Sequence, residues 1–334
     1  MVKELALRSK TFVVGFNIYN NWRFGRRFRV GNAASDHGVV HVGLDLPASL
    51  RYIDRSYDVF VTCPGFSADM FRDRSILEAG TGDNFGLALT FLAAGARRVV
   101  TIDKFYSKRD PEQQRRIYQA MRERLEPGAR ARFDRAIDLG AGIKTNDDVL
   151  RYIYGIGIEE ADRILPGERF DFVISKGALQ DVPTIDRAFA VMDDFLVPGG
   201  WMMHKIDLSD QGMFSRNGQH PLMYLTIPDS IYGWMSTHSG KANRRLRSYY
   251  EGQLRDRDYD VRVLATRILG REGELRPHKA RLEPGVDYTP SERARVAAIR
   301  PKLLPRYRGL PEEELLTSGI MLLGRKPGGA TGQP

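Results

Sequence analysis

The chain has 334 residues, of which 51 are Lys or Arg, 42 are Asp or Glu and one is Cys. A hydrophobic fraction of 42% is too high for a disordered chain, and no stretch approaches the roughly 20 uninterrupted apolar residues of a transmembrane helix. The single Cys63 excludes an internal disulfide framework and a cysteine-rich zinc site, and the length predicts one large domain or two.

Positive charge is concentrated at the N-terminus. Residues 1–30 contain seven Lys and Arg against one Glu, which is +6 of the formal net charge of +9. Aromatic residues are interleaved with these cations, at Phe12, Phe16, Tyr19, Trp22, Phe24 and Phe28. One interpretation is an arm whose aromatic side chains pack on the main domain. A second is a peripheral contact with membrane lipid or a lipid-linked substrate, and a third is nucleic acid.

Strand-like and helix-like segments alternate through the middle of the chain. Strands are expected at residues 75–79, 98–102, 170–175 and 201–206. Helices are expected around residues 48–60, 84–94, 111–125 and 185–196. This alternation is typical of a parallel α/β sheet.

The C-terminal third adds two more strand-like runs, at residues 260–268 and 318–325. We expect residues 271–314 between them to be a surface insertion with a short helix at 291–299. The predicted organisation is a basic N-terminal arm with helices over 1–70, a cofactor-binding core over 71–206, a substrate lid over 207–259, the end of the sheet over 260–326 and a tail over 327–334.

The central motif is the glycine loop that follows the first strand. Gly80 and Gly82 allow a ligand to approach the backbone closely, which a nicotinamide-binding domain also requires. Asp103 lies 21 positions after Gly82, as an acid that binds a ribose would in either case. Glu78, however, would set a carboxylate beside a pyrophosphate, and Phe85 replaces the third glycine of the dinucleotide pattern. Glu78 suits a ligand with an ammonium or sulfonium group; a tight turn without a ligand is the remaining alternative.

Three motifs together carry a resemblance to a known family. They are the loop at residues 76–86, Asp103 at the end of the second strand, and the Phe170–Ser175 run followed by Pro198-Gly199-Gly200. Over about residues 70–325 the chain resembles class I S-adenosylmethionine-dependent methyltransferases. The resemblance implies a Rossmann-like, seven-stranded, mostly parallel sheet with an antiparallel final strand, here residues 318–325, and lid insertions.

The resemblance also implies S-adenosylmethionine as the cofactor. The residues that it assigns to the cofactor are Glu78, Gly80, Thr81, Gly82, Asn84, Asp103, Lys104, Phe105, Ser175 and Lys176. Gly80 and Gly82 would face the methionine part, Asp103 would bind both ribose hydroxyls, and Lys104 and Phe105 would lie beside the adenine. Residues 154–159 are a candidate for the adenine edge. Ser175 and Lys176 correspond to positions near the transferred methyl group.

Candidate catalytic residues lie near the end of the strand at residues 201–206 and directly after it. His204, Asp207 and Asp210 would meet at the ligand edge of the sheet, where His204 could remove a proton from an acceptor hydroxyl. Two other interpretations are a divalent cation held by Asp207 and Asp210, and a purely structural role in which the aspartates cap the next helix. We predict no metal site.

The His-x-Ile-Asp-Leu start of this block and its Asn-Arg-x-Leu-Arg segment resemble bacterial methyltransferases tied to polysaccharide or glycolipid assembly, although Gln211 replaces a common His. The resemblance implies O-methylation of a sugar hydroxyl. Arg244, Arg245 and Arg247 either bind an anionic group of the acceptor or form a solvated helix face. We expect no signal peptide and a cytoplasmic protein, with membrane contact at the inner face as an option. Alternatives are a small-molecule or RNA methyltransferase, an NAD-dependent oxidoreductase, and a non-catalytic cofactor-binding subunit.

Overall fold

Residues 9–32, 34–36, 38–140 and 142–328 are described by a computed structural model. The chain divides into two units. Unit 1 comprises residues 1–31, 177–185 and 204–322, and unit 2 comprises residues 32–176, 186–203 and 323–334. Most of the predicted C-terminal tail, residues 329–334, lies outside the described residues.

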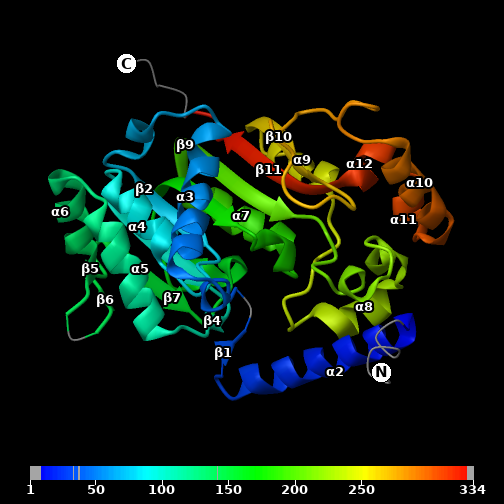
Figure 1. Cartoon of the computed structure of the whole chain (residues 1–334), viewed down its shortest axis with the longest axis horizontal. Coiled ribbons are helices and arrows are strands. Elements are labelled where there is room, and N and C mark those ends of the chain that lie inside the picture. The colour runs from blue at the N-terminus through cyan, green and yellow to red at the C-terminus, as the bar shows by residue number, and fades with distance from the viewer. Residues whose placement is uncertain (1–8, 33, 37, 141, 329–334) are drawn as a thin grey trace. The chain divides into compact units, whose positions relative to one another are not determined.

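Seven strands form one mixed sheet in the order β10-β11-β9-β8-β2-β3-β7 (Figure 1). Their bounds are β2 Ser75–Ala79, β3 Arg98–Asp103, β7 Leu150–Tyr154, β8 Phe170–Lys176, β9 Leu196–Asp207, β10 Asp260–Ile268 and β11 Thr317–Arg325. β2 pairs in parallel with β3 and β8, and β3 pairs in parallel with β7. The predicted fold class, a mostly parallel α/β sheet, is confirmed.

The final strand has the predicted antiparallel direction against β9. The Lys326 amide donates to the Gly200 carbonyl at 2.9 Å, and the Leu208 amide donates to the Ser318 carbonyl at 2.9 Å. Residue numbers rise along one strand as they fall along the other, which defines an antiparallel pair. β11 lies between β9 and β10.

Unit 2 holds the parallel part of the sheet and the helices beside it. These helices are α3 Leu46–Thr62, α4 Gly86–Ala93, α5 Pro111–Glu123, α6 Pro127–Ala136 and α7 Ile185–Phe195. Asp45 caps α3 and Asp110 caps α5, each by accepting backbone N–H groups of the first turn. All five residues of β2 are buried, which is expected for a parallel strand covered on both faces.

Two short strand pairs also belong to unit 2. Ala34–Ser35 (β1) pairs in parallel with Tyr106–Ser107 (β4), and Ile137–Asp138 (β5) pairs with Lys144–Thr145 (β6) in antiparallel orientation. The first pair ties the segment before α3 to the chain that follows β3.

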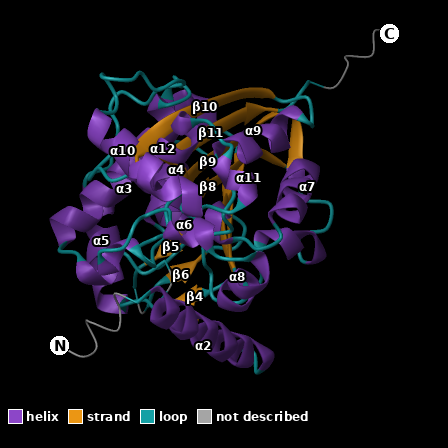
Figure 2. Cartoon of the chain, turned by 90° about the vertical axis from the view of Figure 1, so that its right-hand side faces the viewer, coloured by secondary structure: helices purple, strands orange, loops and turns teal. Residues whose placement is uncertain are grey.

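Unit 1 has its own hydrophobic core, which includes Leu225, Met235 and Ile299. Its helices are α2 Lys10–Arg29, α8 Asp229–Ser236, α9 Arg247–Arg255, α10 Pro290–Ile299, α11 Pro305–Arg308 and α12 Glu312–Leu316. α2 packs on α8 (Figures 1 and 2). The basic N-terminal segment is therefore a regular helix, not an irregular arm, over the part that the structure describes.

The expected strands at residues 75–79 and 260–268 match the observed bounds. The strand expected at 201–206 is longer: β9 begins at Leu196, so Pro198, Gly199 and Gly200 lie within it. Gly199 has a φ of +76°, a conformation that glycine adopts without steric cost. The Asn-Arg-x-Leu-Arg segment is not helical before Arg247, because Arg244 has a φ of +63° and breaks the helical conformation.

An aromatic cluster supports the core of unit 2. Phe71 is fully buried, and its ring centroid lies 4.8 Å from that of Phe91 and 4.9 Å from that of Phe172. The three side chains come from the segment before β2, from α4 and from β8, so they join a helix to the sheet.

We expect Phe71→Ala to lower the free energy of unfolding by about 3–5 kcal/mol, because it removes a large buried ring and leaves a cavity. Phe16→Ala is the matched control, since Phe16 is 51% exposed and its removal should change stability by less than about 1 kcal/mol. Urea denaturation followed by circular dichroism measures both. Equal losses for the two variants would contradict the assignment of Phe71 to the core.

Candidate functional site

Two residues of the turn between β2 and α4 adopt the left-handed conformation that favours glycine. Gly80 has a φ of +85° and Gly82 a φ of +67°. A side chain at Gly82 would also lie 2.8 Å from the Gly38 carbonyl oxygen. The Gly82 amide donates to Asp103 Oδ2 at 3.1 Å, so this backbone path fixes the glycine loop against the end of β3.

Asp103 ends β3 with both carboxylate oxygens held in place. Oδ1 accepts the Phe105 amide at 2.9 Å and Oδ2 accepts the Gly82 amide. Burial raises the pKa of Asp103, and these two hydrogen bonds, together with the charge of Arg109, oppose that rise. Each oxygen can accept another hydrogen bond, because a carboxylate has about four lone-pair sites. Two fixed acceptors on one group suit the two hydroxyls of a ribose.

Glu78 is buried at 5% exposure near the carboxyl end of β2, and its Oε2 has no hydrogen-bond partner among the described residues. The pKa of Glu78 is raised to about 8, chiefly by burial and secondly by the nearby Asp103, while Lys176 and Arg109 oppose the rise. The carboxyl group is therefore mostly protonated at neutral pH. A positively charged ligand beside it would favour the carboxylate.

More buried polar atoms around this turn lack a partner within the described ranges. They are Thr81 Oγ1, Asn84 Nδ2 and His41 Nδ1. Buried polar atoms are satisfied in the great majority of cases, so several unsatisfied ones at one place indicate a site for a polar ligand. These unsatisfied donors and acceptors in unit 2 fit S-adenosylmethionine, whose methionine part offers an ammonium, a carboxylate and a sulfonium.

The adenine side of the predicted site carries a further cation. Arg109 lies 4.1 Å from the Phe85 ring centroid and 4.4 Å from that of Tyr152, and it donates to the Gly82 carbonyl at 3.2 Å. Lys104 forms an ion pair with Glu159 at 3.8 Å, which links the end of β3 to the segment after β7. No motif in the sequence indicates Arg109, because a basic pair such as Lys108-Arg109 before a polar helix is common.

A strap formed by residues 38–41 lies on the glycine loop. The Asp83 carboxylate accepts the amides of Val40 at 3.0 Å and His41 at 2.8 Å, and the Asp83 amide donates to the Gly38 carbonyl at 3.1 Å. No motif in the sequence predicts this strap. Its only signal was a run of small and polar residues about 40 positions before the loop.

The strap places His41 against Tyr52, which also contacts Lys176, the lysine expected near the transferred methyl group. His41 packs edge-on against Tyr52 with 5.3 Å between ring centroids, and Lys176 Nζ lies 3.8 Å from the Tyr52 centroid. Burial lowers the pKa of His41, Asp83 opposes this and Lys176 adds to it, so the imidazole is neutral at neutral pH. Ser175, the neighbour of Lys176, is fully buried and pairs with Ala79 in the sheet.

His204, the histidine predicted to be catalytic, lies within a buried strand that belongs there to unit 1, whereas the glycine loop belongs to unit 2. Its side chain is fully buried within β9, and burial lowers its pKa to about 3. A group with that pKa is a weak proton acceptor at neutral pH. The expectation that His204 acts as the base is therefore not supported, because the strand continues through this position and encloses the side chain.

Asp207 and Asp210 have structural partners within unit 1. Asp210 is 1% exposed and accepts the amides of Gly212, Phe214 and Ser215 and the Ser215 hydroxyl. This corresponds to the capping role that the sequence left open for it, at a turn and not at an α-helix. Asp207 accepts the Ser209 amide and pairs with Arg267 at 3.2 Å.

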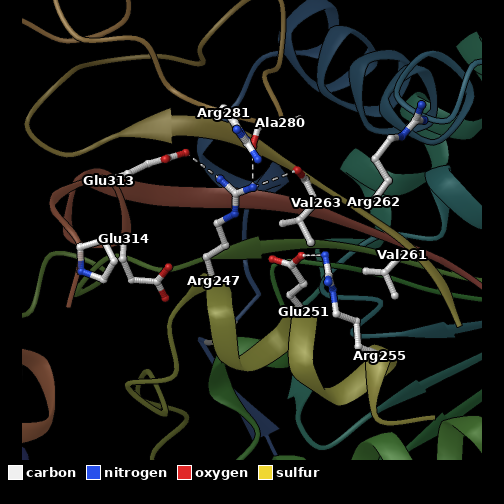
Figure 3. Close-up of a pocket in the computed structure, with 11 residues that line it drawn as sticks. Arg247, Glu251, Arg255, Val261, Arg262, Val263, Ala280, Arg281, Glu313 and Glu314 are labelled. Atoms are coloured by element: carbon white, nitrogen blue, oxygen red, sulfur yellow. Dashed lines mark hydrogen bonds and ion pairs between the residues drawn. The ribbon is translucent and has the colours of Figure 1, made fainter. Parts of the chain in front are cut away.

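Arginines in the following segment are also engaged within unit 1. Arg244 is buried, pairs with Asp229, donates to the Ile227 carbonyl at 2.6 Å and lies 3.9 Å from the Tyr232 centroid. Arg247 lines a pocket of about 430 Å³ between α9 and β10 and is paired with Glu313 at 3.1 Å (Figure 3). Gln211 donates to Asp181 at 2.6 Å.

Two kinds of feature are absent from the described residues. No group of three or more His, Cys, Asp or Glu is arranged to hold a metal ion there. No described helix combines the length and apolar character needed to cross a membrane.

No protein-family model and no curated protein matches the sequence. Among solved structures, the chain is similar to the CurJ carbon methyltransferase, with 11% identity over 85% of this chain and 58% of that one and a TM-score of 0.40. It is similar to a chain of the complex between the Haloferax volcanii Trm112 methyltransferase activator and the putative methyltransferase, with 13% identity, 84% and 94% coverage and a TM-score of 0.40. It is also similar to an S-adenosylmethionine-dependent methyltransferase from Mesorhizobium loti, with 14% identity, 82% and 100% coverage and a TM-score of 0.40.

The buried carboxyl group gives a pH dependence that can be measured. Glu78 keeps its proton up to about pH 8 in the folded chain, compared with 4.5 as its ordinary value, so the folded state binds more protons between these values. The contribution of Glu78 to the free energy of unfolding is therefore fully present below pH 4.5. It is lost progressively as the pH rises from 4.5 to about 8. We expect Glu78→Gln to gain stability relative to the natural chain across this window, by up to about 1.4 kcal/mol per pH unit.

Urea denaturation at several pH values between these limits measures the difference. Glu123→Gln on the exposed surface of α5 is the matched control and should show no such trend. A constant difference between Glu78→Gln and the natural chain at all pH values would contradict the buried, protonated carboxyl group.

Proposed function

We propose that the chain is an S-adenosylmethionine-dependent methyltransferase whose cofactor binds in unit 2, at the carboxyl ends of β2 and β3. The observation that carries the proposal is the Glu78 carboxyl group, buried beside a glycine turn with an oxygen that lacks a partner among the described residues. A diphosphate would gain no charge pairing from this acid and would keep it protonated, whereas a cationic ligand offsets the cost of ionising it.

In this proposal each cofactor residue has a separate task. Asp103 accepts the ribose hydroxyls through the two oxygens that the Gly82 and Phe105 amides hold in place. Gly80 and Gly82 keep side chains away from the methionine part, and Glu78 favours its positive charge. Lys104 and Phe105 flank the adenine. When bound, the cofactor supplies an electrophilic methyl group.

The acceptor we propose is a hydroxyl group of a sugar, in a glycan or glycolipid precursor. Its support is the sequence resemblance of the segment after His204 to methyltransferases of polysaccharide and glycolipid assembly. Residues 207–259 and 271–314 would form the substrate lid. The sequence contains a single cysteine, Cys63, which agrees with a cytoplasmic enzyme. A lipid-linked acceptor would bring the enzyme to the inner membrane face, and the basic N-terminal helix is suited to that contact.

We propose His41 as the proton acceptor in place of His204. His41 Nδ1 is buried and has no partner among the described residues, and the imidazole is neutral at neutral pH. Its hydrogen-bonded strap holds it near Tyr52 and Lys176. Lys176 would favour the developing negative charge on the acceptor oxygen, and Asp83 would stabilise the imidazolium that forms.

Binding is the first test of the proposal. We expect isothermal titration calorimetry to show binding of S-adenosylmethionine and of its demethylated product, and none of NADH. Asp103→Asn should weaken binding roughly 10- to 100-fold, because it removes charge-assisted hydrogen bonds to the ribose. Asp58→Asn on α3 is the control, since Asp58 is exposed on the same unit.

The same titration reports on Glu78. Because this carboxyl group is mostly protonated at pH 7 without a cation, binding of S-adenosylmethionine should release close to one proton. Repeating the titration in buffers of different ionisation enthalpy measures the release, and Glu78→Gln should abolish it. Tight binding of NADH without binding of S-adenosylmethionine would refute the proposed function.

Catalysis is tested with tritiated methyl transfer into a cell-envelope extract. His41→Gln should lower the rate roughly 100- to 10,000-fold with little change in cofactor binding, because it removes the proton acceptor. His204→Gln should change thermal stability more than the rate measured on the folded fraction. A His41→Gln variant with the natural rate would exclude His41 as the base, and the inverse pattern would restore His204.

A further inference from the structure

The N-terminal helix α2 buries a largely polar face and exposes an aromatic one, which is the reverse of the usual arrangement for a helix packed on a protein core. Its buried stripe is Val13, Asn17, Asn21 and Gly25. Its aromatic stripe is exposed, with Phe12 at 42%, Phe16 at 51%, Tyr19 at 54% and Trp22 at 51%. These four rings follow one another at intervals of four, three and three residues, so they share one face of the helix. The interpretation that all the aromatic residues pack on the protein is wrong for these four.

Specific contacts within unit 1 hold the buried stripe in place. The His238 amide donates to Asn21 Oδ1 at 2.7 Å, and Lys10 Nζ donates to Thr226 at 2.8 Å. A side chain at Gly25 would lie 2.8 Å from the His238 ring, so the helix approaches this ring closely. Rotating α2 to bury the aromatic rings would break these contacts. The exposure of the rings is thus a built feature of unit 1.

The charge on α2 limits what can cover the aromatic stripe. The helix contains Lys10 and four arginines at positions 23, 26, 27 and 29, and no acidic residue. Arg23 lies 5.9 Å from the Tyr19 centroid and Arg26 lies 5.0 Å from the Trp22 centroid, so cations continue along the aromatic face. A second copy of this helix would be repelled, whereas an anionic surface would be attracted.

The arrangement of the rings favours lipid over nucleic acid. Tyr19 and Trp22 stack on each other with centroids 6.1 Å apart, and guanidinium groups lie over both rings. Ring faces that are already in use are less available for base stacking, on which single-stranded nucleic acid binding depends. Exposed rings along a helix with flanking arginines are typical of helices that lie in the membrane interface.

We propose that α2 is a membrane-docking helix that lies on an anionic lipid surface, with Phe12, Phe16, Tyr19 and Trp22 inserted among the headgroups and Arg23 and Arg26 bound to lipid phosphates. This contact goes beyond methyl transfer and does not require it, since it depends on unit 1 alone. Its function would be to hold the enzyme where a lipid-linked acceptor is available.

Vesicle flotation of the full chain tests the proposal. The chain should float with phosphatidylcholine vesicles that contain phosphatidylglycerol, and not with phosphatidylcholine alone, and added salt should weaken binding. Arg23→Gln/Arg26→Gln should lower partitioning roughly 25-fold, at about fivefold for each arginine near an anionic surface. Phe16→Gln/Trp22→Gln should lower it at least roughly tenfold, because two rings no longer leave water.

A matched pair controls for the loss of charge. Arg255→Gln/Arg281→Gln removes two exposed arginines from the same unit and should leave partitioning within about twofold. Retained circular dichroism and an unchanged melting temperature show that each variant is folded. Neither measurement depends on cofactor binding, so failure of this test and failure of the proposed function remain distinguishable. The proposal is overturned if the natural chain does not float, if both arginine pairs have equal effects, or if the chain binds RNA and not vesicles.

Discussion

A carboxylic acid buried beside a backbone turn is the constraint on which the proposed site depends. Burial of a charge costs far more than burial of a neutral group, so Glu78 stays protonated until a cation offsets the cost. The acid lies in a strand that is buried along its whole length, and its neighbours in the sheet are Thr101 and Ile174. No solvent-exposed position could replace it, because water would stabilise the carboxylate without any ligand.

The backbone around this acid connects the site to the fold. Gly82 bonds to Asp103 by its amide, and the next residue, Asp83, bonds to the strap at Val40 and His41. Three segments far apart in the sequence thus meet at two adjacent residues of one turn. The same short loop therefore orients Asp103, the proposed ribose acceptor, through Gly82, and His41 through Asp83. The parallel sheet supplies the geometry, since its strand ends meet at one edge.

Sequence alone predicted the parts of the fold that local pattern determines. The apolar run at residues 75–79 and the alternating run at 260–268 became strands with those bounds, and the glycines and Asp103 met as the motif implies. The strap was missed because its bonds to Asp83 join residues 42 or more positions apart, which no local pattern records. The surroundings of His204 also depend on pairing between distant segments: β9 continues beyond it to Asp207, and its side chain is enclosed by the sheet.

Charge illustrates the same limit, because a count of cations does not identify the surface that binds an anion. Arg244 and Arg247 drew attention in the sequence as a basic cluster, yet Asp229 and Glu313 neutralise them within unit 1. The helix α2 also contains a cluster of arginines. It contains no acidic residue, however, and its Arg23 and Arg26 lie beside exposed aromatic rings. The partners of a charge therefore carry more information than its sign. In this chain they separate arginines that stabilise the protein from arginines that are placed to meet another surface.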